Sequence, residues 1–236
     1  MQNPNCMPLT AVLGLILMLF TGCNETQLKS GTSVPPKDAI VLFDGTDFSQ
    51  WMTENGGSVP WEIAAGVIEV VPGTGDIMTK QKFQDFKLHI EFNVPQTIQK
   101  GKKRERGKSG VYLQRRYEIQ VMDSYNQEQG IHDCGSIYGV KVPDKNVCRE
   151  PGKWQSYDII FHNARFEGER PNLRKVKNAR ISVWQNGILT HNDVEVPHKT
   201  GSGQPEGPEP APILLQGRDA GYTLRVRFRN IWVVPL

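Results

Sequence analysis

The feature that most constrains this chain is a two-residue alternation of apolar side chains, which runs from Ala39 to the C-terminus. Alternation with period two is typical of β-strands, and no segment in this range shows the spacing of an amphipathic helix. Turn-forming residues separate the alternating segments, as expected for a chain of 236 residues that contains 23 Gly and 16 Pro. The sequence therefore predicts an all-β protein.

The expected strands are numerous enough for two packed sheets. They are Ala39–Leu42, Trp61–Ala64, Val67–Val71, Lys87–Asn93, Gly110–Leu113, Tyr117–Met122, Tyr157–Asn163, Arg180–Gln185, Ile188–His191, Ile213–Gly217 and Thr223–Val234. The Asn186-Gly187 pair between two of these strands predicts a type I′ hairpin turn. Because no repeat or linker divides the body, we expect a single domain over residues 39–236, a jelly-roll β-sandwich of two antiparallel sheets.

The N-terminal segment has the pattern of an export signal. Its apolar run, Leu9–Phe20, is shorter than the roughly 20 residues that span a membrane but has the length of a signal-peptide core. The run leads into Thr-Gly-Cys23, which resembles a bacterial lipobox, so we expect a lipoprotein signal peptide over residues 1–22 and a lipid on Cys23. An ordinary cleaved signal is the alternative. Residues 23–38 lack periodicity and predict a flexible tether to the membrane. The expected location is the cell envelope, either the periplasm or the outer membrane and cell surface.

Export would place the two remaining cysteines, Cys134 and Cys148, in an oxidising compartment, where we expect a structural disulfide between them. A thiolate metal pair is the alternative. It would need further ligands, and only His132 and Asp133 lie close in sequence. No dense ligand cluster identifies a cofactor, and a divalent metal stays open.

The net charge of +3 is too small to indicate nucleic-acid binding, so no such partner is expected. One segment, Gln99–Lys108, is strongly basic, because it contains six Lys or Arg and one Glu. This segment predicts a solvent-exposed hairpin tip. The alternative is a patch for anionic headgroups or acidic glycans.

The segment Tyr117–Asp123 carries the residues most indicative of chemistry. In a strand, its odd-numbered apolar residues point into the core, while Glu118 and Gln120 point to the opposite face. A bulge near Met122 would bring Asp123 onto the face of Glu118. Two carboxylates on one sheet surface are the arrangement that glycosidases use, and a plain polar outer face is the alternative.

The preceding strand adds Tyr112 and Gln114, which share one face. Aromatic rings stack on the C–H surfaces of sugars, so this pair predicts a sugar contact, although such pairs are also common on sheet surfaces. The spacing of Glu118, Gln120 and Asp123 resembles the Glu-x-Asp-x-x-Glu strand of laminarinase-type glucanases. Two of the three residue types differ, so we expect a different mechanism at a similar strand position.

The order of motifs over Val41–Leu236 resembles one family, the 3-keto-disaccharide hydrolase domain. The shared landmarks include Phe43-Asp44-Gly45, Gly75-Asp76, Ser109-Gly110-Val111-Tyr112, Tyr117–Val121, Gly135–Gly139, Leu215-Gln216-Gly217 and Phe228–Ile231. The resemblance implies a concanavalin-like jelly roll that acts on glycosides oxidised to a ketone at C3. Such a ketone acidifies the hydrogen on C2, and loss of that proton lets the enolate expel the aglycone from C1. The reaction needs an acid, a base and a group that stabilises the enolate.

On this hypothesis Glu118 is the base or acid and Asp123 is its partner. The other expected substrate contacts are Gln120, Tyr112, Gln114, Arg115, Arg116, Lys141 and His132. Arg115 and Arg116 are expected on opposite faces of a strand, so at most one of them would polarise the ketone. His132 could also act as a proton relay or metal ligand. The sequence thus predicts an enzyme that cleaves 3-keto-glycosides by elimination and hydration or by hydrolysis. A non-catalytic, lectin-like surface lipoprotein is the alternative.

Overall fold

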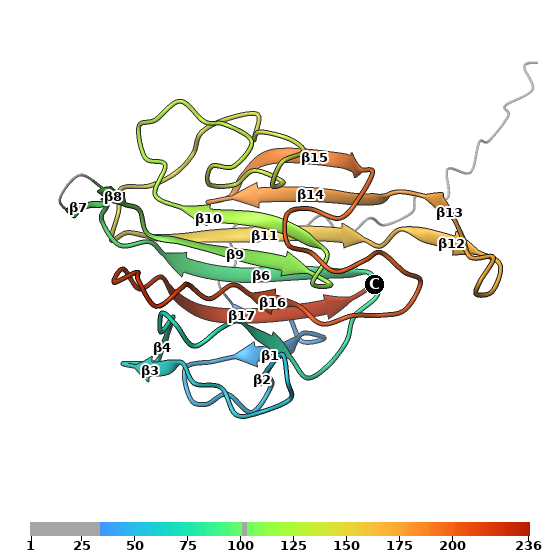
Figure 1. The fold of residues 1–236 in the computed structure, drawn as a ribbon, viewed down its shortest axis with the longest axis horizontal. Coiled ribbons are helices and arrows are strands. Elements are labelled where there is room, and N and C mark those ends of the chain that lie inside the picture. The colour runs from blue at the N-terminus through green and yellow to red at the C-terminus, as the bar shows by residue number, and fades with distance from the viewer. Residues whose placement is uncertain (1–33, 101–102) are drawn as a thin grey trace, which may run out of the picture.

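The structure, a computed structural model, describes residues 34–100 and 103–236 (Figure 1). The predicted signal peptide, Cys23 and most of the predicted tether lie outside the described residues. Within the described ranges the chain forms no helix, so no helix there could span a membrane. The strands are β1 (Ile40–Phe43), β2 (Trp51–Thr53), β3 (Glu62–Ala64), β4 (Val67–Glu69), β5 (Ile77–Thr79), β6 (Phe86–Asn93), β7 (Ile98–Lys100), β8 (Lys103–Glu105), β9 (Lys108–Leu113), β10 (Tyr117–Met122), β11 (Trp154–His162), β12 (Arg165–Glu167), β13 (Arg174–Lys177), β14 (Ala179–Gln185), β15 (Ile188–Val196), β16 (Leu214–Leu215) and β17 (Arg227–Pro235).

Two antiparallel sheets pack against each other and confirm the predicted jelly-roll sandwich. The larger sheet has the order β15-β14-β11-β6-β17-β4-β3, with β1 paired to β17, and the smaller sheet has the order β10-β9-β16-β5-β2. Two short ribbons, β7–β8 and β12–β13, extend from opposite ends of the sandwich (Figure 1). The β7–β8 ribbon is the hairpin that the basic segment predicts.

The alternation of side chains places one face of each long strand in the core between the sheets. In β10, Tyr117, Ile119 and Val121 are fully buried there, as predicted. Alternate residues of β6 face them from the larger sheet. The ring of Tyr117 lies 5.5 Å from that of Phe161 in β11, so aromatic packing joins the two sheets.

The outer face of β10 is also buried, because loops cover the free edge of the strand. The backbone of Gln120 donates to the carbonyl of Ser136 at 3.1 Å, and Tyr138 donates to the carbonyl of Glu118 at 3.0 Å. On the same side, the hydroxyl of Thr200 accepts the backbone N–H of Glu118 at 2.7 Å. Polar side chains on this face therefore lie beneath loops rather than on an open surface.

Three hairpins among the described residues have both central residues in the left-handed region, and one of them is the Ala65-Gly66 turn between β3 and β4. Asn186 and Gly187 have φ values of 53° and 81°, which is the predicted type I′ geometry. Gln114 and Arg115 have φ values of 53° and 54° between β9 and β10. The expectation that Arg115 and Arg116 lie on opposite faces of a strand is therefore wrong, since Arg115 occupies the turn and Arg116 follows it.

Candidate functional site

The outer face of the smaller sheet carries two adjacent rows of side chains from strands distant in sequence. The first row crosses four strands. Glu118 lies opposite Tyr112, Tyr112 opposite Leu214, and Leu214 opposite Met78. Met78, Tyr112 and Leu214 pack into an apolar cluster of their own beside the carboxylate. An apolar strip next to a buried acid is a surface against which the C–H face of a sugar can pack.

The second row is polar and lies one pleat further along the strands. Gln120 lies opposite Gly110, and the backbone of Gln216 donates to the carbonyl of Gly110 at 2.9 Å. Beyond Gln216 comes Asp76, whose Oδ1 accepts the backbone N–H of Gly217 at 2.7 Å. Together, the two rows bring Glu118 and Asp76 onto one sheet face.

Glu118 belongs to the first row, and its side chain reaches toward the second. Its Oε2 accepts the hydroxyl of Tyr112 at 2.7 Å, and its side chain is folded over Gly110, where a methyl group would collide with Oε1. A Cβ on Gly201 in the covering loop would lie 3.3 Å from Oε2. Glu118 is 2% exposed, and its Oε1 has no hydrogen-bond partner among the described residues. A buried carboxylate oxygen without a donor is costly, which points to a role in binding or chemistry.

Charged groups next to Glu118 tune its protonation. Burial raises the pKa of Glu118, and Asp76 raises it further by charge repulsion, while the Tyr112 hydroxyl and the positive charges of Lys108 and Arg218 act in the opposite direction. Burial also raises the pKa of Asp76. Two carboxyl groups with raised pKa values on one sheet face are suited to acid and base roles.

A hollow of about 420 Å³ is lined by Asp76, Gln216, Arg218 and their chain neighbours. Its volume is in the range of small-molecule sites. Buried polar atoms lacking partners among the described residues include Oε1 of Gln216, Oε1 of Gln120 and Nε of Arg218. Sugar hydroxyls both donate and accept hydrogen bonds, so they are matched to a surface with orphaned acceptors and a donor.

Two aromatic side chains stand above Glu118. The ring of Tyr138 lies in contact range of the Gly201 position next to Oε2, and Nζ of Lys108 lies 5.6 Å from its centroid. His132 packs against Tyr138 with 4.5 Å between ring centroids. His132 is thus near the site through Tyr138, and its backbone carbonyl accepts the side-chain amide of Gln120 at 3.1 Å.

Three predicted substrate contacts have other partners in the structure. Gln114 donates to two backbone carbonyls just before β6, at 2.7 and 3.0 Å. Arg116 donates to Oε1 of Gln114 at 2.6 Å and to backbone carbonyls of residues 205–209. Arg115 forms an ion pair with Glu54. These side chains stabilise the β9–β10 turn and a neighbouring loop rather than facing the two rows of side chains.

The structure does not bring Asp123 to Glu118. The pairing of β10 with β9 is continuous from Tyr117 to Met122, so the expected bulge is absent and that expectation is wrong. Asp123 instead accepts a hydrogen bond from the hydroxyl of Thr97 and lines a separate hollow of about 400 Å³. The carboxyl group that accompanies Glu118 is Asp76.

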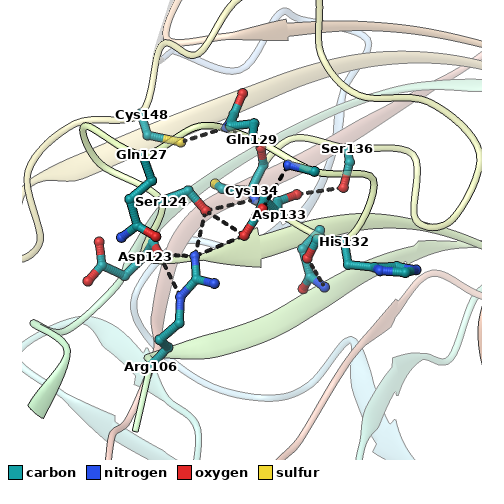
Figure 2. Close-up of polar contacts among 12 residues, drawn as sticks. Arg106, Asp123, Ser124, Gln127, Gln129, His132, Asp133, Cys134, Ser136 and Cys148 are labelled. Carbon is teal, nitrogen blue, oxygen red and sulfur yellow. Dashed lines mark hydrogen bonds and ion pairs between the residues drawn. The ribbon is translucent and has the colours of Figure 1, made fainter. Parts of the chain in front are cut away.

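Arg106 secures the loop that follows β10. Its guanidinium donates to the carbonyl of Asp123 and, at 3.0 and 2.9 Å, to the hydroxyl of Ser124 and the carboxylate of Asp133 (Figure 2). Lys141, further along the loop, forms an ion pair with Asp144. Lys141, predicted as a substrate contact, therefore has an acidic partner within the protein.

Cys134 and Cys148 are free thiols in the structure, so the predicted disulfide is not formed there. The two side chains nevertheless lie near each other, because one amide nitrogen contacts both sulfur atoms. The amide of Gln129 reaches Sγ of Cys148, and that of Gln185 reaches both sulfur atoms (Figure 2 shows the Gln129 contact). Because the thiols already lie together, a disulfide in an oxidising compartment stays a prediction. No group of three or more His, Cys, Asp or Glu side chains within residues 34–100 and 103–236 is placed to hold a metal ion.

Sequence reasoning placed Glu118, Gln120 and Tyr112 on one face but missed four neighbours. Asp76 and Gln216 stood in landmark motifs without a role, and Lys108 was counted as part of the basic segment. Nothing in the sequence around Arg218 singled it out. These residues come together only when β5, β9 and β16 pair.

A jelly roll whose smaller sheet bears this acid, tyrosine and amide surface defines a glycoside-active protein. The model of the 3-keto-alpha-glucoside-1,2-lyase-like domain matches residues 38–234, and the chain belongs to that family. Among solved structures, it is similar to a protein of Parabacteroides distasonis ATCC 8503 named "putative glycosyl hydrolase", with 39% identity, 85% of each chain covered and a TM-score of 0.75.

Two further proteins of that strain bear the same name and share the fold. One is 19% identical, with 86% of this chain and 99% of that chain covered and a TM-score of 0.62. The other is 20% identical, with 84% and 99% covered and a TM-score of 0.56. No curated protein matches the chain. The family predicted from the motifs is thus confirmed.

Proposed function

We propose that this protein cleaves glycosides whose sugar carries a ketone at C3, by eliminating the substituent on C1, with hydration as a later step. Family membership supports this substrate class. The observation that carries the proposal is the buried carboxylate of Glu118, which has one oxygen held by Tyr112 and the other without a partner among the described residues.

In the proposed reaction, Oε1 of Glu118 removes the proton from C2, and the C–H electron pair forms the enolate of the C3 ketone. The enolate then collapses, the C1–O bond breaks, and a double bond forms between C1 and C2. Asp76, whose raised pKa favours its protonated form, supplies the proton to the departing oxygen. The positive charges of Lys108 and Arg218 stabilise the enolate oxygen.

Tyr112 orients the base rather than transferring the proton itself. Burial, together with the negative charge of Glu118, raises the pKa of Tyr112, so its hydroxyl stays protonated and keeps donating to Oε2. The hydrogen bond directs Oε1 over Gly110. The proposal requires the sugar to reach Oε1 from the hollow bounded by Gln216 and Arg218.

The test is cleavage of a 3-keto-disaccharide compared with its unoxidised parent. We expect cleavage of the keto form alone, and reaction in deuterated water should label C2. Glu118→Gln should lower kcat by at least about 100-fold, because a positioned base contributes that much. Glu91→Gln is the matched control, since Glu91 is a partly buried strand carboxylate on the larger sheet. Equal cleavage of both sugars, or sugar binding without cleavage, would overturn the proposal, and the second outcome would favour a lectin.

We also propose that the protein is exported and lipidated at Cys23. The apolar run Leu9–Phe20 followed by Thr-Gly-Cys supports this location. A tethered domain at the envelope would meet oligosaccharides before they are taken up.

A further inference from the structure

Lys108 is a lysine without a counter-ion contact, on the same sheet face as the proposed base. It begins β9 and shares its face with Gly110 and Tyr112, at spacings of two residues. Its side chain is half-buried, and Nζ lies over the ring of Tyr138. Within the described part of the chain, Nζ makes no hydrogen bond or ion pair. The amine of Lys108 can therefore contact a ligand without first breaking an ion pair, whereas Lys141 is paired with Asp144.

The surroundings of Lys108 make its ammonium group easier to deprotonate than that of an exposed lysine. Burial lowers the pKa of its ammonium group, and the positive charges of Arg218 and Arg106 lower it further, against the opposing effect of Glu118. Desolvation and a neighbouring cation are the two devices that convert lysine into a nucleophile toward carbonyl groups.

The amine of Lys108 and the carboxylate of Glu118 both lie near the ring of Tyr138. Its ring lies beside the Gly201 position, at 3.3 Å from a Cβ there, and that same Cβ would be 3.3 Å from Oε2 of Glu118. Nζ of Lys108 lies 5.6 Å from the same ring. Oε1 of Glu118 lies over Gly110, two residues from Lys108 on the same strand face. A sugar carbon bonded to Nζ would therefore have its neighbouring carbon on the sheet face that carries Oε1.

We propose that Lys108 forms an imine with the C3 ketone of the substrate, so that the amine is a covalent catalyst and not only a nearby charge. The inference rests on the proposed function, because it requires a keto sugar. It is carried by the position of Nζ on the face of Glu118, over Tyr138 and without a counter-ion contact.

The chemistry balances with water as the only co-reactant. The neutral amine adds to C3, and the carbinolamine takes one proton from solvent and loses one water to leave a protonated imine. Oε1 of Glu118 takes the C2 proton, the C–H electron pair forms the C2–C3 double bond of a neutral enamine, and the former C=N π pair becomes the nitrogen lone pair. Expulsion of the C1 oxygen, which takes a proton from Asp76, regenerates the protonated imine next to the new C1–C2 double bond. Water then hydrolyses the imine and releases Lys108.

The test is reductive trapping. The purified protein is incubated with free 3-keto-glucose and cyanoborohydride, and intact mass and peptide mapping follow. We expect a mass increase of one reduced sugar, located on Lys108, and no adduct with glucose. Lys108→Arg, which keeps the charge, should lose the adduct and reduce cleavage of the 3-keto-disaccharide by at least about 100-fold, because arginine cannot form the imine. Lys87→Arg, a half-buried strand lysine on the larger sheet, is the control and should keep both.

The outcomes separate this inference from the proposed function. Cleavage by the wild-type protein without any adduct on Lys108, or full turnover by folded Lys108→Arg, would overturn the imine and leave the elimination intact. An adduct on Lys108 without cleavage of the disaccharide would support the imine and reject the proposed function. A near-ultraviolet circular dichroism spectrum confirms that each variant is folded.

Discussion

Glu118 is a residue at which burial and chemistry oppose each other. Its carboxylate is 2% exposed, and burial raises its pKa above the ordinary value for glutamate. Folding therefore shifts Glu118 toward its protonated form relative to the unfolded chain. This contribution to stability is fully present below the pKa of glutamate in the unfolded chain, and it is lost as the pH rises through the folded-state pKa. An ionised Glu118 thus lowers stability at the pH where it can act as a base.

Glu118→Gln should consequently stabilise the protein while abolishing its activity. We expect a gain of about 1 kcal/mol at pH 8, the order found when a functional strain is relieved, and no gain at pH 4. Urea unfolding at the two pH values measures it. Glu91→Gln is a control of opposite sign. Although burial opposes it, hydrogen bonds from Asn230 and Arg229 lower the pKa of Glu91. Removing the Glu91 carboxylate should therefore lower the free energy of unfolding at high pH. A Glu118→Gln protein that is less stable at both pH values would contradict this account.

At the scale of elements, the β9–β10 hairpin organises the loop beside the site. Arg116, 6% exposed, donates to the side chain of Gln114 and to the carbonyls of Pro205, Gly207 and Glu209. The hairpin turn thereby holds residues 205–209 in place. These residues follow Thr200 and Gly201, which cover Glu118. Arg116, predicted from the sequence as a substrate contact, acts on the site through this loop.

Arg116→Ala should therefore weaken the structure before it affects chemistry. Leaving several buried acceptors unpaired should cost about 3 kcal/mol of unfolding free energy. Hydrogen exchange should accelerate in residues 199–210 and much less in β11. Arg116→Lys should rescue only part of the loss, because lysine lacks the planar fork of donors. Arg180→Ala, which removes an exposed ion pair with Asp193, is the control and should change neither measurement. Unchanged exchange in residues 199–210 would show that the loop is held by other contacts.

For the whole molecule, the proposed membrane anchor and the catalytic sandwich are separable. The family match begins at residue 38, close to the predicted end of the tether. The two rows of side chains beside Glu118 come from β5, β9, β10 and β16 and include no residue before Asp76. Anchoring and catalysis should therefore be altered independently.

In a bacterial host, the full-length chain should sediment with membranes and incorporate labelled fatty acid. Cys23→Ala should abolish the label, and the isolated 34–236 segment should be equally active per molecule toward the 3-keto-disaccharide. Fractionation, labelling and kcat/KM measure these outcomes. Label retained in Cys23→Ala would refute lipidation at this residue.

The sequence by itself determined the strands that bury one regular face and the residues that face away on the same strand. Period two sufficed for β10, and Asn-Gly sufficed for the 186–187 turn, because both signals are local. It also identified Glu118, Gln120 and Tyr112 as a group, since one short hairpin carries them. The turn at Gln114 and Arg115 was missed, as neither residue is a usual turn former.

Only the tertiary structure decided which side chains stand beside Glu118. Asp76, Gln216 and Arg218 reach it through strand pairing between segments that lie far apart in the chain, and strand order is set by core packing rather than by local pattern. Asp123, near in sequence, is directed away because the regular register of β10 continues without a bulge. Proximity along the chain misled the choice of the second carboxylate, since side chains across a sheet are neighbours through register alone.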